Sequence, residues 1–313
     1  MKQYKKPNLF ILLIFLLVSV QTFAQTDIDA IMMEKNAFCV GSMYSYSGWS
    51  NYWEGTKKRN NANLGTVTTQ MIGIMGNYGV AKNLNALFNI PYVFTKASAG
   101  TLKGQHGIQD LSLMLKYRPI NKKISNARLA VYGIAGGSVP LSNYVADFLP
   151  LSIGLQSRTA MARLMVDYYY NSKWFATASA TYVFRSNIKL DRNSYYTDHL
   201  ILSNEVEMPN ATSFNIRAVY RTQWLIAEAV LNNWTTQGGF DITQNNMPFP
   251  SNRMNATSLG VNIKYVFKKI PQLSLNGGAN NIIAGRNVGQ SFNANGAVFY
   301  VFDLNKKEKK KKK

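Results

Sequence analysis

Apolar and polar residues alternate with a period of two along most of the chain. In the stretch 259–267 the odd positions are Leu, Val, Ile, Tyr and Phe, whereas the even positions include Gly, Asn and Lys. The stretches 86–94, 111–118, 163–170 and 214–221 repeat this alternation. It is typical of a strand with one face in an apolar medium and the other in water. No stretch with the 3.6-residue period of a helix competes with it.

The alternation predicts about twelve strands separated by spacers that are short and long in turn. The expected strands are 39–54, 65–80, 84–97, 108–119, 127–138, 156–170, 174–187, 213–222, 224–234, 256–269, 272–284 and 291–304. The long, polar spacers are 55–64, 98–107, 139–155, 188–212 and 235–255, and 285–290 is shorter. Short turns at one end and long loops at the other are typical of bacterial outer-membrane barrels, which have an even number of strands.

Tyrosine and tryptophan cluster beside the short spacers, as membrane-interface girdles require. The aromatic residues concerned are Tyr78, Tyr117, Tyr168, Tyr170, Trp174, Tyr220, Trp224, Tyr265 and Phe267. A soluble β-sandwich would also show alternating apolar and polar residues, but nothing in that fold requires Tyr and Trp at one end of every hairpin. We therefore predict an all-β protein: a transmembrane antiparallel up-and-down barrel of about twelve strands, closed because lipid cannot satisfy a free strand edge. The short turns face the periplasm, and the long loops face outwards.

The N-terminus predicts export. Lys2, Lys5 and Lys6 precede the apolar run 9–20, which is too short to span a membrane and ends in Thr-Phe-Ala before Gln25. We expect a signal peptide at 1–24, a barrel domain at 25–305 and a Lys-rich periplasmic tail at 306–313. These features place the chain in the cell outer membrane.

Charge and composition then direct attention to the barrel interior. The net charge is +20, of which three charges lie before residue 9 and a net six in the tail, leaving +11 for the rest. The 46% apolar content excludes disorder, and a single cysteine excludes a disulfide scaffold. Strand parity turns several charged residues inwards, and from them we predict a lumen constriction formed by Asp110, Lys116, Arg163, Asp167, Arg185, Arg217, Glu228 and Lys264. Such a basic lumen selects anions or orients an acidic substrate, or else its ion pairs fill a narrow barrel and hold it closed. Asp110 has a second interpretation, as a cap of the Gly107 turn.

Motifs for catalysis, metals and nucleic acids are not found. His106 and His199 stand in predicted outer loops without catalytic spacing, and the 136–140 stretch lacks a nucleophile elbow. One cysteine and two distant histidines do not form a metal site. We expect no enzyme activity, no cofactor and no nucleic-acid partner. The lysine tail is interpreted as a solvated run, or as a contact with anionic headgroups or cell-wall polymer.

One predicted hairpin carries a family resemblance. Residues 90–94 read Ile-Pro-Tyr-Val-Phe, and after a polar loop residues 107–118 read Gly-Ile-Gln-Asp-Leu-Ser-Leu-Met-Leu-Lys-Tyr-Arg. This hairpin resembles the hallmark of the outer-membrane transporter family named for the MetA phenol-degradation pathway, with its Pro-Tyr strand and Gly-x-x-Asp-Leu-x-Leu-x-x-Lys-Tyr strand. The resemblance implies an outer-membrane barrel that passes small, often aromatic or hydrophobic compounds. The chain differs from typical outer-membrane barrels in its last strand. These barrels end at an aromatic residue, whereas Phe302 is followed by further residues and a lysine tail.

These observations predict a passive channel or transporter for small hydrophobic or anionic molecules, embedded in outer-membrane lipid. The alternative is a non-conducting structural or secretion-associated protein whose long loops 188–212 and 235–255 bind membrane or periplasmic protein partners. The two differ in whether the lumen is open or sealed.

Overall fold

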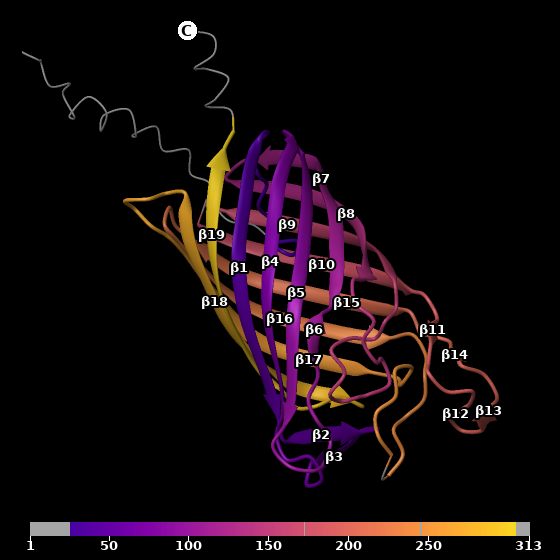
Figure 1. Ribbon diagram of the computed structural model, residues 1–313. Coiled ribbons are helices and arrows are strands. Elements are labelled where there is room, and N and C mark those ends of the chain that lie inside the picture. The colour runs from indigo at the N-terminus through magenta and orange to yellow at the C-terminus, as the bar shows by residue number, and fades with distance from the viewer. Residues whose placement is uncertain (1–25, 172, 245, 305–313) are drawn as a thin grey trace, which may run out of the picture.

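Twelve long strands close into an antiparallel barrel in the computed structural model, which describes residues 26–171, 173–244 and 246–304 (Figure 1). The strands are β1 (Ala37–Trp49), β4 (Val67–Ala81), β5 (Leu84–Ala97), β7 (Asp110–Ile124), β8 (Ala127–Pro140), β9 (Thr159–Tyr170), β10 (Trp174–Arg185), β15 (Ala211–Arg221), β16 (Leu225–Thr236), β17 (Asn255–Val266), β18 (Leu273–Arg286) and β19 (Phe292–Asp303). Each pairs with its neighbours in sequence. The predicted fold class is confirmed.

Strand β1 closes the barrel, because it pairs with both β4 and the last strand, β19. Phe38 lies opposite Tyr78 on one side and opposite Phe302 on the other. Since every long strand has two partners, the barrel has no free edge among its described strands, which is the condition for crossing lipid.

The outer surface of the barrel is an apolar belt. Leu164, Ile216 and Leu113 are each more than half exposed, although they stand in the middle of their strands. Tyr170 and Trp174 are register partners beside the 171–173 turn, and both are also more than half exposed. Large apolar side chains exposed in the middle of a closed barrel, with aromatic residues at its rim, are the features of a surface that faces lipid.

The long loops carry short strands of their own, which the sequence pattern did not separate. These are the pair β2 (Asn51–Glu54) and β3 (Lys57–Asn60), the single β6 (His106–Ile108), and the nested pairs of β11 (Ile188–Lys189) with β14 (Glu205–Val206) and β12 (Tyr195–Tyr196) with β13 (Leu200–Ile201). In Figure 1 the labelled β2, β3 and β11–β14 lie towards the lower end of the barrel, away from the end at which β19 finishes.

Several strand boundaries differ from the predicted ones, among them the end of β7, which continues to Ile124 instead of 119. The expected strand 39–54 ends at Trp49, because the chain bends at Ser50 and the β2–β3 hairpin turns away to donate from the Trp53 N–H to the Val288 oxygen at 2.9 Å. The expected strand 256–269 ends at Val266, where residues 267–272 form the short connection to β18.

A cluster of polar contacts around the Asp241–Arg286 ion pair connects three of the long loops. Asp241 accepts hydrogen bonds from Arg286 Nε at 2.8 Å and from Asn287 Nδ2 at 2.7 Å. Asn287 Oδ1 in turn accepts from the Gly55 N–H at 2.7 Å. The hydrogen bonds from Arg286 hold the pKa of Asp241 below its ordinary range.

We expect Asp241→Asn to loosen the 237–254 loop, because it removes the charge that Arg286 binds. The lowered pKa means that this contribution to stability is complete above the pKa of a free aspartate, about 3.9, and is lost as the pH falls further. At pH 7 trypsin should therefore cleave after Arg253 faster in the variant. Asp198→Asn, a loop aspartate that is 84% exposed, is the control. Equal cleavage of both variants and the parent would contradict this role.

Some expectations fall beyond the described residues. The signal peptide at 1–24 and the lysine tail at 306–313 lie outside them and remain predictions. Within the described residues no helix is long and apolar enough to cross a membrane.

Candidate functional site

Residues 26–36 run inside the barrel before β1 begins, and we call them the inner segment. They form no strand, and they join β1 at the end of the barrel where the short turns lie. Asn36 N–H donates to the Gly79 oxygen at 2.8 Å, which fixes the segment to β4. A Cβ at position 79 would lie 1.9 Å from the Glu34 oxygen, so the close approach requires glycine there.

Lys116 on β7 is the main polar anchor of the inner segment. Its ammonium group donates to the Thr26 oxygen at 3.1 Å, to the Asp29 carboxylate at 3.2 Å and to the Asp29 backbone oxygen. The Lys116 side chain is fully buried. Asp29 also accepts from the Thr26 N–H at 2.7 Å and the Ile31 N–H at 3.1 Å, so it organises the segment itself.

Two further polar contacts hold the same segment to β8 and β9. Arg163 donates to the Asp27 carboxylate at 2.8 Å and to the Asp27 backbone oxygen at 3.2 Å. Tyr132 donates its hydroxyl hydrogen to the Ala30 oxygen at 2.8 Å. These donors satisfy backbone oxygens that have no strand partner, which explains how an irregular segment stays ordered inside a barrel.

Apolar side chains complete the packing of the inner segment. Ala30 belongs to a buried cluster with Tyr132 and Met165, and Ile31 packs against a second cluster that contains Phe175. Met33 is 2% exposed and packs beside the start of β1 and the end of β19. The segment is therefore fastened by ion pairs to β7 and β9 and by apolar contacts to strands on several sides of the barrel.

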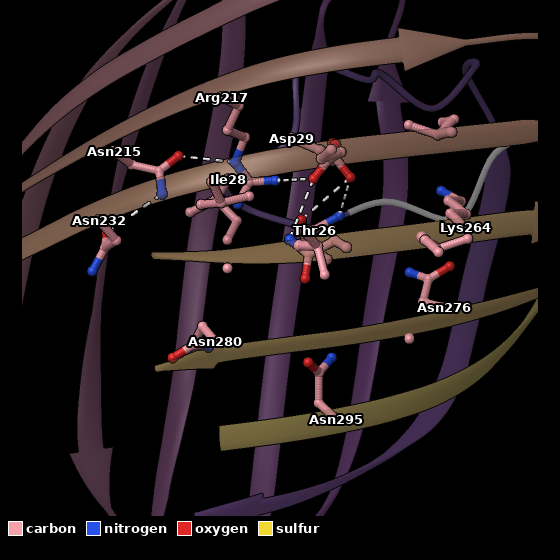
Figure 2. A pocket seen from close by; sticks show the side chains of 18 of the residues that line it. Thr26, Ile28, Asp29, Asn215, Arg217, Asn232, Lys264, Asn276, Asn280 and Asn295 are labelled. Atoms are coloured by element: carbon pink, nitrogen blue, oxygen red, sulfur yellow. Dashed lines mark hydrogen bonds and ion pairs between the residues drawn. The ribbon is translucent and has the colours of Figure 1, made fainter. Parts of the chain in front are cut away.

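A cavity of about 520 Å³ remains between the inner segment and the opposite wall, formed by β15 to β19 (Figure 2). Arg217 and Lys264 reach into it from this wall, and Thr26, Ile28 and Asp29 border it on the segment side. The volume lies within the range of about 300–1,000 Å³ that is typical of small-molecule sites.

The eight charged residues predicted to form a constriction fall into three places. Arg217, Glu228 and Lys264 line the cavity. Lys116 and Arg163 lie on the far side of the inner segment, and Asp167 is buried on β9, where it accepts from Thr177. Asp110 and Arg185 stand at the long-loop end of β7 and β10, away from the others.

Among these eight residues, Arg217 and Glu228 form the one ion pair with each other in the described part of the chain, at 2.7 Å. Lys116 and Arg163 bind Asp29 and Asp27 instead of acids on the barrel wall, because the inner segment lies between the walls. The basic residues are therefore largely neutralised, and the excess of inward positive charge is smaller than the wall alone implies.

The two residues at the loop end have local partners. Asp110 accepts from the Tyr144 hydroxyl at 2.6 Å rather than capping the Gly107 turn. Burial raises the pKa of Tyr144, so it remains a donor. Arg185 lies over the Trp234 ring at 5.4 Å, a cation–π contact.

Neither the inner segment nor the asparagines of the cavity were predicted from the sequence. Residues 26–36 were counted as part of the barrel, although the signal was present: three of the 15 acidic residues, Asp27, Asp29 and Glu34, stand between the expected cleavage site and the first alternating strand. Among the described residues no group of three His, Cys, Asp or Glu side chains could hold a metal ion.

The closed barrel, its apolar belt and its partly filled lumen define an outer-membrane β-barrel with the fold of a channel. Residues 57–296 match the family described as "Putative MetA-pathway of phenol degradation", and the chain belongs to this family. A comparison with curated proteins found no match.

A solved structure of an outer-membrane channel supports the same fold. The crystal structure of the COG4313 outer membrane channel from Pseudomonas putida F1 is similar with a TM-score of 0.71 at 15% identity, over 90% of this chain and 100% of that one. The β domain of the Bordetella autotransporter BrkA gives a TM-score of 0.45 at 14% identity, over 86% and 100%. The CymD monoaromatic hydrocarbon channel gives 0.38 at 11% identity, over 87% and 89%.

Proposed function

We propose that this protein is a passive channel for small molecules across the outer membrane, and that the inner segment limits its open cross-section. The observation that carries the proposal is the cavity of about 520 Å³ inside a closed barrel, bordered by a segment that no strand pairing holds. A segment fixed by side chains can leave the wall without breaking the barrel. The family and the channel fold of the Pseudomonas protein support the same reading.

The charges around the cavity favour weak ion selectivity over the anion selectivity that the net charge of the chain suggested. Arg217 is bound by Glu228 and by Asn215 Oδ1, at 2.7 and 2.8 Å. Asp27 and Asp29 bring two negative charges against Arg163 and Lys116. Opposite charges this close cancel most of the field that a permeating ion would meet.

Arg217→Gln should therefore shift the channel towards cations, because it leaves the Glu228 carboxylate in the cavity without its arginine. The measurement is the reversal potential under a salt gradient in planar bilayers. Lys268→Gln, an exposed lysine in the short 267–272 connection, should leave the reversal potential unchanged. If Arg217→Gln altered only thermal stability, the cavity would not lie on the ion path.

One feature favours the second candidate, a protein that binds a partner through its loops. The β12–β13 tip exposes Tyr196 by 61%, Leu200 by 60% and Leu202 by 82%. Exposed apolar patches often mark interaction sites. Recovery of the same membrane proteins with the parent and with a Leu200→Ser, Leu202→Ser variant would exclude this role for the tip.

A further inference from the structure

Asparagine side chains gather on the cavity wall that faces the inner segment (Figure 2). Seven asparagines line the cavity, and four of them follow one another on the last three strands: Asn262 on β17, Asn276 and Asn280 on β18, and Asn295 on β19. Strand pairing makes them close neighbours, because Asn262 and Asn295 both lie opposite Gly278. These four asparagines therefore form a patch of carboxamides on this wall, next to Lys264, which lies opposite Asn276.

Two asparagines that border the cavity keep hydrogen-bonding capacity that the protein does not use. Asn276 Oδ1 on β18, and Asn89 Oδ1 on β5 outside this wall, are buried acceptors without a hydrogen-bond partner in the described part of the chain. A buried acceptor left in this condition costs about 1–3 kcal/mol. By contrast, Asn215 and Asn280 are engaged, the first by Arg217 and the second by Asn293. The Asn276 and Asn89 amides must rotate towards the cavity to accept from a solute, and such a rotation breaks no hydrogen bond of their oxygens.

The opposite side of the cavity has a different character. Met43 on β1, Met75 on β4, and Ile28 and Ile31 of the inner segment give it apolar side chains. A solute in the cavity meets hydrogen-bonding amides on one face, and on the other it meets these apolar side chains beside the polar groups of Thr26, Asp27 and Asp29. No Phe, Tyr or Trp is among the described residues that line the cavity, so ring stacking is not the basis of recognition.

We propose that this cavity binds uncharged polyhydroxylated solutes, of the sugar or cyclic polyol class, and that the asparagine wall selects them. The proposal rests on the channel function and names its solute class. A hydroxyl both donates and accepts, as a carboxamide does, so the two satisfy each other without a charge. A hydrocarbon would leave several amides desolvated and unpaired, which a polar site rejects strongly. The charges that border the cavity are of both signs, Arg217 and Lys264 against Glu228, Asp27 and Asp29, so they favour an uncharged solute over an ion.

The test combines binding and passage in the full chain. Saturation-transfer NMR on the detergent-solubilised protein should detect glucose, whereas glucuronate and toluene should give no signal. Asn276→Leu keeps a similar side-chain volume without hydrogen bonds, and it should weaken glucose binding about tenfold, since a hydrogen bond contributes about 1.4 kcal/mol. The matched control is Asn281→Leu on the same strand, because Asn281 faces outwards and is exposed.

Swelling of proteoliposomes with the same three solutes separates this inference from the channel function. Faster entry of glucose than of glucuronate, reduced by Asn276→Leu but not by Asn281→Leu, supports the inference. Binding of glucose without entry would retain the inference and overturn the channel function. Entry of all three solutes without preference, or unchanged glucose binding in folded Asn276→Leu, would overturn the inference and leave the channel function intact.

Discussion

Deletion of residues 26–33 is expected to speed the entry of small solutes into proteoliposomes several-fold. The inner segment occupies the part of the lumen between the cavity and β7, β8 and β9, and its ion pairs to Lys116 and Arg163 keep it there. The described strands begin only at Ala37, so the deletion removes no strand pairing. The measurement is the swelling rate with neutral solutes of increasing size, where the deletion should also raise the size limit.

Two checks make the deletion decisive. A heat-dependent shift in gel mobility and a β-type circular dichroism spectrum must show that the barrel has formed. Asp27→Asn with Asp29→Asn provides a full-length variant that weakens the same contacts and should swell at an intermediate rate. If a folded deletion variant admitted solutes no faster than the parent, the inner segment would not limit passage.

Lys116→Met is expected to release the inner segment without shortening the chain. Lys116 is fully buried and donates to three oxygens of the segment. Its loss therefore leaves the Asp29 carboxylate inside the barrel without its ion-pair partner. Removing one partner of a buried ion pair costs about 3–5 kcal/mol. A loss of about 3 kcal/mol raises the ratio of released to bound segment about a hundredfold.

Release can be measured as the rate at which a maleimide labels Ile28→Cys. The native Cys39 is buried, and Cys39→Ala in the background removes its contribution. Lys122→Met is the matched control, since Lys122 lies on the same strand but is exposed. We expect much faster labelling with Lys116→Met and no change with Lys122→Met. Equal rates in all three proteins would contradict the anchoring role of Lys116.

The barrel could be predicted from the sequence because lipid and water impose the alternation directly. Leu259, Val261 and Ile263 are each more than half exposed on the outer surface, as their parity predicts, while Lys264 is buried on the inner one. Turn length was equally informative, since residues 171–173 join β9 to β10 where the short spacer stands. Local chemistry is enough for these features, because each strand pairs with its neighbour in sequence.

The interior was less predictable, because no periodic constraint acts on the inner segment. Asp29 meets Lys116 across 87 positions of sequence, and nothing in strand parity indicates that an irregular segment turns into the lumen. Strand parity placed Arg163 in the lumen but did not indicate its partner, which is Asp27 of the inner segment. Arg217 and Glu228 were predictable because they lie on adjacent strands of one hairpin.

The most direct test of the account is a planar-bilayer recording of the intact protein beside the 26–33 deletion. The account predicts small, uniform conductance steps with weak ion selectivity for the intact chain, and larger steps for the deletion in the same membrane. Absence of steps from both folded proteins, or steps of equal size, would contradict a channel whose cross-section is set by its inner segment.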